Sequence, residues 1–442
     1  IMFNFHDNSP VNFNDSLPDA VDVVIIGGGI IGITTAWYLL EQGKSVLVCD
    51  KGRVAGEQSS RNWGWVRVTG RDEAEVPIAR ESTYLWDALN KELNGELGFT
   101  RGGCLALAST QAELEGFEQW IELSDKYDVG TRMLTPEQSN SLVGAPAGKW
   151  HGAMITDSDG RAEPFKAVPT LAKGLQQKGG LIRENCAVRT IEVEAGRTTG
   201  VITEYGAVKA QTVLCAAGAW STLMLSNMGI KLPQLSLKGT VARTEPAPEI
   251  YTGAAAFSDV FIRRRQDGGY TIATGFTEHF IAANSFRYLS KFIPSMGSAS
   301  DLRALPGRDP TQQSFIKKSW TGNDMSPFES HRVLNPEPTK SAVKLMREKL
   351  EQHIPALADV PFAQTWAGMI DTTPDVVPVM DETHVPGLFL ATGFSGHGFG
   401  IGPAAGKVMA NLITGNETGH DLHRFRFSRF SDGSKVVPGP AI

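Results

Sequence analysis

The sequence has little of what marks several common classes of protein. Its 442 residues include only four cysteines: Cys49, Cys104, Cys186 and Cys215. No two of them form a Cys-x-x-Cys pair, which argues against a disulfide scaffold, a zinc site or a thioredoxin-type motif. No uninterrupted apolar run reaches the roughly 18 residues that a membrane-spanning helix needs.

Charge and the N-terminal segment exclude further classes. The formal net charge is −6, so no basic surface is expected for nucleic acid. Residues 1–20 have neither the basic start nor the apolar stretch of a signal peptide, and they predict a polar arm. We therefore expect a cytoplasmic protein with reduced thiols and with no metal, nucleic-acid partner or membrane span.

What the chain does have is a globular composition that is rich in glycine. Hydrophobic residues make up 41% and charged residues 20%, which is enough for buried cores, and the length predicts roughly two or three domains of about 150 residues. The 47 glycines indicate tight turns and places where the backbone approaches a ligand closely.

The strongest motif lies near the N-terminus, where a strand, a turn and a helix follow one another. Residues 23–26 are apolar and β-branched, as expected of a strand covered on both faces. Residues 33–42 predict a helix that ends at Gly43, and residues 45–49 predict a second strand that closes on Asp50. The turn carries G-x-G-x-x-G, and this order of elements is typical of a dinucleotide site.

Each residue of the turn has a physical task. Gly27 permits the sharp bend, Gly29 lets a pyrophosphate approach the backbone, and Gly32 lets the helix pack closely on the strand. The helix N-terminus offers free N–H groups and the positive end of its dipole to phosphate. The expected site therefore includes Ile30 and Ile31.

Further segments depart from the repeated βα units of an NAD dehydrogenase. Residues 51–65 form a loop of small, polar and aromatic residues. Residues 188–194 predict a strand that opens a hairpin, and residues 211–215 predict another that leads into a small-residue turn. Residues 387–399 pass from a strand into a glycine-rich turn, followed by a predicted helix at 403–414 whose N-terminus again favours a ligand.

Taken in order, these segments resemble the glycine/sarcosine/D-amino-acid oxidase family of FAD enzymes. The matching pieces span residues 21–415 and read IIGGGIIGITTAWYL, GEQSSRNWG, VLCAAGAWS and LFLATGFSGHGFGIGPAAGKVMANLITG. Three shorter stretches, VAGEQSSR, SPFE and QTWAG, are most similar to the L-amino-acid deaminase branch.

The resemblance implies an FAD that lies extended across the switch point of a parallel sheet. It places the pyrophosphate at residues 27–32, the adenosine ribose at Asp50 and the adenine edge near Val188. The residues expected to bind FAD are Gly27, Gly29, Ile30, Ile31, Gly32, Asp50, Lys51, Ser59, Ser60, Arg61, Asn62, Trp63, Val188, Ala217, Gly218, Trp220, Gly393, Gly396, His397, Gly398, Phe399 and Gly400. Residues 368–375 contain no cysteine where the sarcosine-oxidase branch attaches its flavin, so we expect non-covalent binding.

The expected fold class is α/β, with a Rossmann-like FAD-binding domain and an antiparallel-sheet α+β substrate domain. The FAD domain is predicted to be discontinuous, since its segments are separated by other blocks. The expected ranges are 21–94, 152–231 and 362–430 for the FAD domain, and 95–151 and 232–361 for the substrate domain.

The substrate side is expected at a hairpin in residues 257–276. Successive residues of a strand point to opposite faces, so two of Arg263, Arg264 and Arg265 share a side. An inward arginine can bind a substrate carboxylate through two parallel hydrogen bonds, unless the triplet is a solvated edge strand. The deaminase branch assigns the role to Arg263, and Arg67, which follows the flavin loop, is the second candidate.

Aromatic residues and a histidine complete the expected substrate site. The resemblance favours Trp366 as a pocket wall, and Trp63 and Trp65 are further candidates, although each is equally consistent with core packing. His397 is expected near the flavin, with a plain turn residue as the alternative.

These features predict an FAD-dependent oxidoreductase that oxidises the C–N bond of an amino acid or N-substituted amino acid. Hydride would pass to flavin N5, and the resulting imine would be hydrolysed. Two alternatives are an FAD-dependent 2-hydroxy-acid dehydrogenase and a flavin electron-transfer subunit without its own substrate. The stereochemistry of the substrate stays open, and either oxygen or a quinone or other redox partner would accept the electrons.

Overall fold

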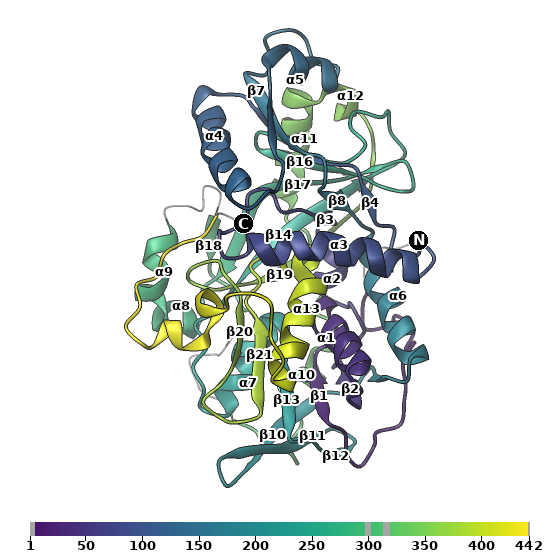
Figure 1. Cartoon of the computed structure of the whole chain (residues 1–442), viewed down its shortest axis with the longest axis vertical. Coiled ribbons are helices and arrows are strands. Elements are labelled where there is room, and N and C mark those ends of the chain that lie inside the picture. The colour runs from purple at the N-terminus through teal and green to yellow at the C-terminus, as the bar shows by residue number, and fades with distance from the viewer. Residues whose placement is uncertain (1–4, 297–301, 313–318, 441–442) are drawn as a thin grey trace.

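The first of two large sheets is built around the N-terminal glycine motif. The computed structural model describes residues 5–296, 302–312 and 319–440. The sheet has six strands in the order β20-β21-β13-β1-β2-β9. Their bounds are Val23–Ile26 (β1), Val46–Cys49 (β2), Leu181–Arg183 (β9), Thr212–Cys215 (β13), Val379–Glu382 (β20) and Leu388–Thr392 (β21). All pair in parallel except β20, so β1, β13 and β21 end at the same edge (Figure 1).

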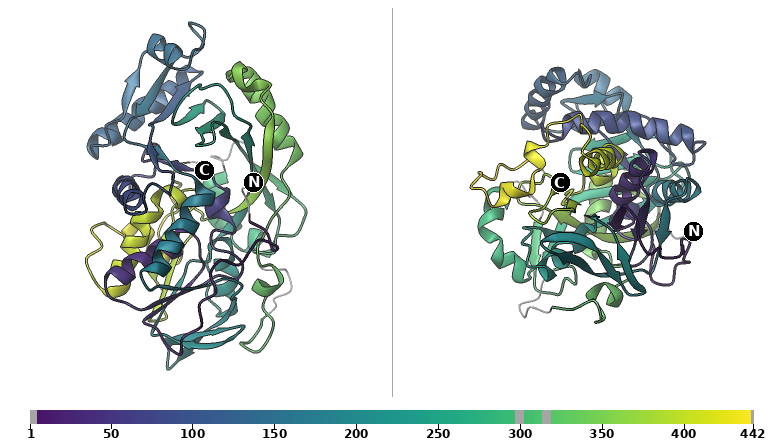
Figure 2. Two further views of the ribbon diagram at one scale, coloured as in Figure 1. Left: turned by 90° about the vertical axis from the view of Figure 1, so that its right-hand side faces the viewer. Right: turned by 60° about the horizontal axis from the view of Figure 1, so that its bottom comes forward.

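Helices from distant parts of the chain cover one face of this sheet (Figures 1 and 2). They are α1 (Ile30–Glu41), α6 (Pro164–Gln177) and α13 (Gly398–Thr414), and α3 (Val76–Glu92) packs across α13. Helices α1 and α13 lie close because glycines face α1: a Cβ on Gly402 would lie 2.4 Å from Ile30 Cγ1, and one on Gly406 would lie 2.2 Å from Thr34 Oγ1. Larger residues at these two positions would force the helices apart.

A small antiparallel sheet and a helix cover the opposite face. They are β10 (Val188–Glu194), β11 (Arg197–Thr203), β12 (Gly206–Lys209) and α7 (Ser221–Asn227). Their apolar side chains pack on Val24, Ile26 and Leu47 of the large sheet, which explains why these strands are apolar on both faces.

The second large sheet is mainly antiparallel and forms the upper part of Figure 1. Its order is β19-β14-β17-β16-β15-β5-β7-β6, with β18 paired to β17. The strands are Cys104–Ala108 (β5), Arg132–Leu134 (β6), Gly152–Thr156 (β7), Leu235–Thr244 (β14), Ala254–Phe257 (β15), Val260–Arg264 (β16), Tyr270–Phe280 (β17), Leu302–Leu305 (β18) and Phe362–Thr372 (β19). The accompanying helices are Gln111–Lys126 (α4), Pro136–Leu142 (α5), Ala283–Arg287 (α8), Leu289–Met296 (α9), Lys340–His353 (α11) and Pro355–Ala358 (α12).

Short elements connect the two sheets. Three two-residue strands, β3 (Trp65–Val66), β4 (Thr100–Arg101) and β8 (Gly160–Arg161), form a small sheet in the order β3-β8-β4. The remaining helices are Gln58–Arg61 (α2) and Pro327–Ser330 (α10), with 3-10 turns at Gly218–Trp220 (η1), His423–Phe425 (η2) and Phe427–Phe430 (η3). In the described part of the chain, no helix is both long and apolar enough to cross a membrane.

The predicted α/β fold with a Rossmann-like unit is confirmed, and two details differ from expectation. Strands β7 and β19 fall within the ranges expected for the FAD domain, but they pair in the nine-stranded sheet. Helix α13 begins at Gly398, before the predicted start at Pro403. Gly398, Gly400 and Gly402 are poor helix formers, and the close packing on α1 and α3 overrides that propensity.

The expected N-terminal arm is docked along the six-stranded sheet rather than free. Its first four residues lie outside the described residues. Phe13 is buried, and Asn14 forms an isolated bridge to Arg183 of β9. The guanidinium of Arg53 donates to the carbonyl oxygens of Ser9 and Asp7, which fixes the start of the arm.

Candidate active site

A cavity of about 770 Å³ lies between the two large sheets. The carboxyl ends of β1 and β2 and the N-terminus of α1 line one part of it. The faces of β14, β16, β17 and β19 and the turn before α13 line the rest. Ligands of open α/β sheets bind at this edge, outside the carboxyl ends of the strands.

The G-x-G-x-x-G turn has the geometry that the sequence predicts. Gly27 has φ of +110°, and a Cβ there would lie 2.4 Å from the carbonyl oxygen of Ala216. A Cβ on Gly32 would lie 2.0 Å from the carbonyl oxygen of Gly27, so only glycine permits this crossing of helix and strand. At the helix N-terminus, the N–H of Ile30 donates to Ser59 Oγ at 2.9 Å.

Asp50 lies at the end of β2 with its carboxylate partly open to the cavity. Its Oδ2 accepts from the N–H of Gly28 at 2.8 Å, and its Oδ1 accepts from the N–H of Gly52 at 2.7 Å. Burial raises the pKa of this carboxyl, while the two N–H groups and the charge of Lys51 oppose the rise. Each oxygen keeps a lone pair for a further donor, as a ribose hydroxyl would require.

Most of the residues predicted to bind FAD line the cavity. They are Gly27, Gly29, Ile30, Ile31, Asp50, Lys51, Ser59, Arg61, Asn62, Trp63, Val188, Ala217, Gly218, Trp220, Gly396, His397, Gly398 and Phe399. Four predicted residues lie behind the lining: Gly32, Ser60, Gly393 and Gly400. Gly393 donates its N–H to Asp371 Oδ2 at 2.6 Å, and the carbonyl oxygen of Gly400 accepts from Trp86 Nε1 at 3.0 Å.

Glu57 is a cavity residue that the sequence analysis missed. Its carboxylate accepts from Lys51 Nζ at 2.6 Å, Trp220 Nε1 at 2.9 Å and the N–H of Leu334 at 3.0 Å. Burial opposes its ionisation, but the charge and hydrogen bond of Lys51 hold the pKa below its usual range. The ammonium of Lys51 also lies 4.3 Å from the centre of the Trp220 ring. Glu57 thereby joins three segments around the nucleotide end of the cavity.

The structure corrects the prediction that Arg263 binds a substrate carboxylate. Arg263 is 1% exposed and does not line the cavity. Its Nη1 pairs with Glu163 Oε1 at 3.0 Å, and its Nε donates to the carbonyl oxygen of Trp63 at 2.6 Å. Its Nη2 donates to Thr271 Oγ1, which also accepts from Arg265, so these two arginines share a side as alternation predicts. That side is filled by Glu163, which leaves Arg263 no donor directed at a ligand.

Trp366 also lies outside the cavity lining, contrary to the expectation of a pocket wall. Its Nε1 donates to the carbonyl oxygen of Arg61 at 2.9 Å and thereby ties β19 to α2. Aromatic wall residues are found elsewhere: Trp63 stacks on Phe261 at 4.8 Å between ring centres, and Trp65 meets both rings edge-on. All three line the cavity.

Arg67 and Arg71 are among the arginines that line the cavity. Arg67 is the second candidate from the sequence; its Nη1 donates to the carbonyl oxygen of Thr69, and its guanidinium lies 5.6 Å from the Trp65 ring centre. Arg71 was missed. It is 5% exposed, and its Nε and Nη1 are buried with no hydrogen-bond partner among the described residues. Burial, reinforced by the charge of Arg67, lowers the pKa of Arg71 to about 9.

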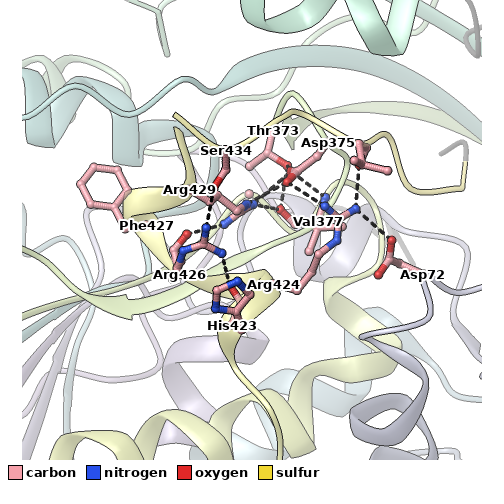
Figure 3. Close-up of polar contacts among 12 residues, drawn as sticks. Asp72, Thr373, Asp375, Val377, His423, Arg424, Arg426, Phe427, Arg429 and Ser434 are labelled. Atoms are coloured by element: carbon pink, nitrogen blue, oxygen red, sulfur yellow. Dashed lines mark hydrogen bonds and ion pairs between the residues drawn. The ribbon is translucent and has the colours of Figure 1, made fainter. Parts of the chain in front are cut away.

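The segment that carries these arginines is held rigidly. The carboxylate of Asp159, fully buried, accepts from the N–H groups of Val68 and Thr69 and from Thr69 Oγ1. At the next turn Asp72 Oδ2 pairs with Arg424 Nη2 at 3.1 Å (Figure 3). The backbone therefore positions the guanidinium of Arg71, whose Nε and Nη1 make no hydrogen bond to the described residues.

The C-terminal segment fixes a second loop of the cavity. Arg429 Nε donates to Asp375 Oδ2 at 2.7 Å, and its Nη2 donates to Asp375 Oδ1 at 3.0 Å, as Figure 3 shows. Asp375 precedes Val376, a lining residue with φ of +61°. This paired hydrogen bonding holds the strained loop that follows β19.

His397 lies at the N-terminus of α13 and lines the cavity. Its Nδ1 lies 3.2 Å from both carboxylate oxygens of Glu75, which is fully buried at the N-terminus of α3. Burial, followed by the charge of Arg71, lowers the pKa of His397, so the ring is neutral at neutral pH. Its Nε2 is buried without a hydrogen-bond partner in the described part of the chain.

Comparison with known proteins agrees with this geometry. The DAO family model, described as FAD dependent oxidoreductase, matches residues 22–412. This chain belongs to the DAO family. The family resemblance expected from the sequence is thereby confirmed, and the glycine turn, Asp50 and the turn before α13 are the parts of this DAO-family protein suited to FAD.

Several proteins whose names state an activity are similar to this chain over most of its length. Sarcosine oxidase subunit beta of Rhodobacter capsulatus is 24% identical, over 95% of this chain and 92% of its own length. D-amino acid dehydrogenase of Xylella fastidiosa strain M23 is 26% identical, over 88% of this chain and 91% of its own. L-amino acid deaminase from Proteus myxofaciens, in its structure in complex with anthranilate, shares 28% sequence identity with this chain. The two structures superpose with a TM-score of 0.89 over 96% of each chain.

Proposed function

We propose that the protein oxidises an amino acid or N-substituted amino acid, and that Arg71, assisted by Arg67, binds the substrate carboxylate. The buried guanidinium of Arg71 carries this proposal. Among the described residues its Nε and Nη1 have no hydrogen-bond partner, although the carboxylates of Glu75 and Asp159 act on its charge. Buried donors of a charged group that make no hydrogen bond are costly, and they are retained where an anionic ligand completes them. The named relatives act on amino acids or on sarcosine, and anthranilate, the ligand of the deaminase structure, bears a carboxylate beside an amine.

The residues of the cavity fit FAD in their chemistry and order. A Cβ on Gly29 would lie 3.1 Å from Ser59 Oγ, so the glycine keeps the backbone beside the helix N-terminus open to a pyrophosphate. Asp50 would bind the ribose, and Gly396, Gly398 and Phe399 would line the flavin. When bound, FAD supplies the acceptor for the hydride.

The chain's own part in the reaction is to bind, orient and exclude water. Arg71 and Arg67 would hold the carboxylate, which fixes the position of the neighbouring carbon whose hydride leaves. Trp63, Trp65 and Phe261 form an apolar wall beside Arg67 and restrict water. Release of ammonia or a smaller amine distinguishes this reaction from oxidation of a 2-hydroxy acid, which releases neither.

We expect the flavin to be bound non-covalently. The segment from Gly368 to Asp375 has no cysteine, and Cys49, which lines the cavity, is the last residue of β2, at the nucleotide end. The purified protein should be yellow and should lose its colour to the supernatant on acid precipitation. Flavin that stays with the denatured chain on an SDS gel would contradict the expectation.

Replacing Asp50 with alanine is expected to weaken FAD retention by roughly 1–3 kcal/mol, because a charged acceptor for the ribose is lost. Flavin occupancy after serial dilution measures the effect. Asp87→Ala is the matched control, since Asp87 pairs with Lys91 on the outside of α3 and does not line the cavity. Equal flavin occupancy in the two variants would show that Asp50 does not contribute to FAD binding.

The electron acceptor and the cellular location stay predictions. We propose that oxygen or a quinone or other redox partner reoxidises the flavin, and that the protein acts in the cytoplasm. Stopped-flow reoxidation of the reduced protein by oxygen and by a soluble quinone separates the two kinds of acceptor.

A further inference from the structure

The Glu75–His397 pair has a geometry that the carboxylate site alone does not explain. Both oxygens of Glu75 face His397 Nδ1 at 3.2 Å, which assigns the ring proton to Nδ1 and leaves a lone pair on Nε2. The two residues are 322 positions apart and come from the N-termini of α3 and α13. A satisfied core histidine would use both nitrogens, whereas Nε2 is buried and has no partner among residues 5–296, 302–312 and 319–440.

We propose that His397 Nε2 accepts a proton from the ammonium group of the bound substrate, and that Glu75 is the positioning residue for this step. The inference rests on the proposed function, because it assumes a substrate carboxylate at Arg71. In an amino acid the nitrogen is one carbon away from the carboxylate carbon. Arg71 and His397 both line the cavity, and the charge of Arg71 acts on the ring, so the proposal places the nitrogen of a substrate held by Arg71 on the side of the ring.

Oxidation of the C–N bond by hydride loss requires the neutral amine, so a substrate that binds as an ammonium must first lose a proton. An ammonium group has no lone pair to support departure of a hydride from the neighbouring carbon. In the proposed step a substrate N–H bond breaks, an N–H bond forms at Nε2, and the electron pair stays on the substrate nitrogen. FAD, when bound, would supply the two-electron acceptor for the hydride, and the imine would take up water to release ammonia or an amine.

Glu75 is the charge that favours this transfer. The groups that act on the ring are Glu75 at the N-terminus of α3 and Arg71 and Arg67 in the segment before it. The two guanidinium groups lower the pKa of the ring and of a nearby substrate ammonium alike, so they do not set the direction of the transfer. Glu75 stabilises the imidazolium that forms. The ring is neutral before the substrate arrives because burial lowers its pKa.

The test compares His397→Asn with the unaltered holoprotein. The substrate is whichever of sarcosine, L-proline, D-alanine and L-phenylalanine reduces the flavin fastest. At pH 7 we expect kcat/KM to fall about 100-fold, the lower end of general-base contributions. The deficit should shrink about tenfold per pH unit as the pH approaches the pKa of the substrate ammonium, because free amine then binds directly. Glu75→Gln should show a smaller loss with the same pH trend.

A binding measurement gives a second readout without turnover. 2-Aminoisobutyrate has no α-hydrogen and cannot be oxidised, and isobutyrate lacks the amine; both are followed through the flavin absorbance. The unaltered protein should lose affinity for 2-aminoisobutyrate, but not for isobutyrate, between pH 8 and pH 5.5, and His397→Asn should abolish that loss. His420→Asn is the matched control, since His420 pairs with Glu81 outside the cavity lining.

The outcomes separate the two proposals. A loss in His397→Asn that is independent of pH, or one that extends equally to isobutyrate binding, would reduce His397 to a structural residue and overturn the inference alone. Failure of every amino acid in the panel to reduce the flavin of the unaltered protein would overturn the proposed function and this inference with it.

Discussion

Arg71→Leu is expected to lower kcat/KM for the amino-acid substrate by about 100- to 1,000-fold. Removing one partner of a buried charge pair costs roughly 2–5 kcal/mol, and the loss should appear mainly in substrate binding. Steady-state kinetics with the best substrate of the amino-acid panel measure the effect. Flavin content should be unchanged, since no step of FAD binding depends on Arg71.

We also expect Arg71→Leu to have an unusual effect on stability. Without substrate, Nε and Nη1 of the buried Arg71 have no hydrogen-bond partner among the described residues, and only the more distant charges of Glu75 and Asp159 offset the burial. Replacing Arg71 should therefore leave the melting temperature unchanged or raise it, as expected where stability is given up for function. Arg67→Leu serves as the comparison and should have the smaller kinetic effect, because Arg67 is less buried and already donates to Thr69. A strongly destabilised Arg71→Leu with normal kinetics would assign Arg71 a purely structural role.

Arg263→Leu should behave in the opposite way and destabilise the fold by about 3–5 kcal/mol. It leaves Glu163, which is 2% exposed, as a buried charge whose other arginine partner, Arg265, is 4.0 Å away. Chemical denaturation of the holoprotein gives the difference in the free energy of unfolding. The double variant Arg263→Leu/Glu163→Leu should recover part of the loss, because no unpaired charge remains.

Arg264→Leu is the control for this position. Arg264 is less buried, donates to the carbonyl oxygen of Ala247 and stacks on Tyr270, so its replacement should cost about 1 kcal/mol or less. A selective rise in KM for Arg263→Leu, with unchanged stability, would restore Arg263 as the carboxylate-binding residue.

The local parts of the fold were predictable from the sequence. The glycine turn, its helix and Asp50 are specified within residues 23–50, and the structure has all three, with the helix beginning at Ile30 rather than at the predicted Ile33. The hairpin of β16 and β17 and the shared side of Arg263 and Arg265 also follow from alternation along the strand. Such patterns depend only on residues that are close together in the sequence, so they can be identified from one sequence alone.

The site on the substrate side depends on partners that no local pattern reveals. Alternation along the strand predicts which two arginines share a side, but it does not predict which residue faces that side. That residue is Glu163, which lies at the start of a helix 100 residues earlier in the sequence. Arg71 lies in the charged stretch GRDEAE, which resembles a solvated surface until α3 and α13 enclose it. The contact between Glu75 and His397 likewise exists only because two distant helices begin at the same place.

The central claim is that an amino acid bound at Arg71 reduces the flavin. Anaerobic absorbance titration of the holoprotein with sarcosine, L-proline, D-alanine and L-phenylalanine tests it most directly, with glycolate, D-lactate and L-phenyllactate as controls. We predict bleaching of the flavin band by at least one amino acid and no bleaching by the hydroxy acids. One equivalent of amine or ammonia should be released, except from L-proline, whose nitrogen stays attached to the product. Bleaching by a hydroxy acid instead, or by none of these compounds, would contradict the account.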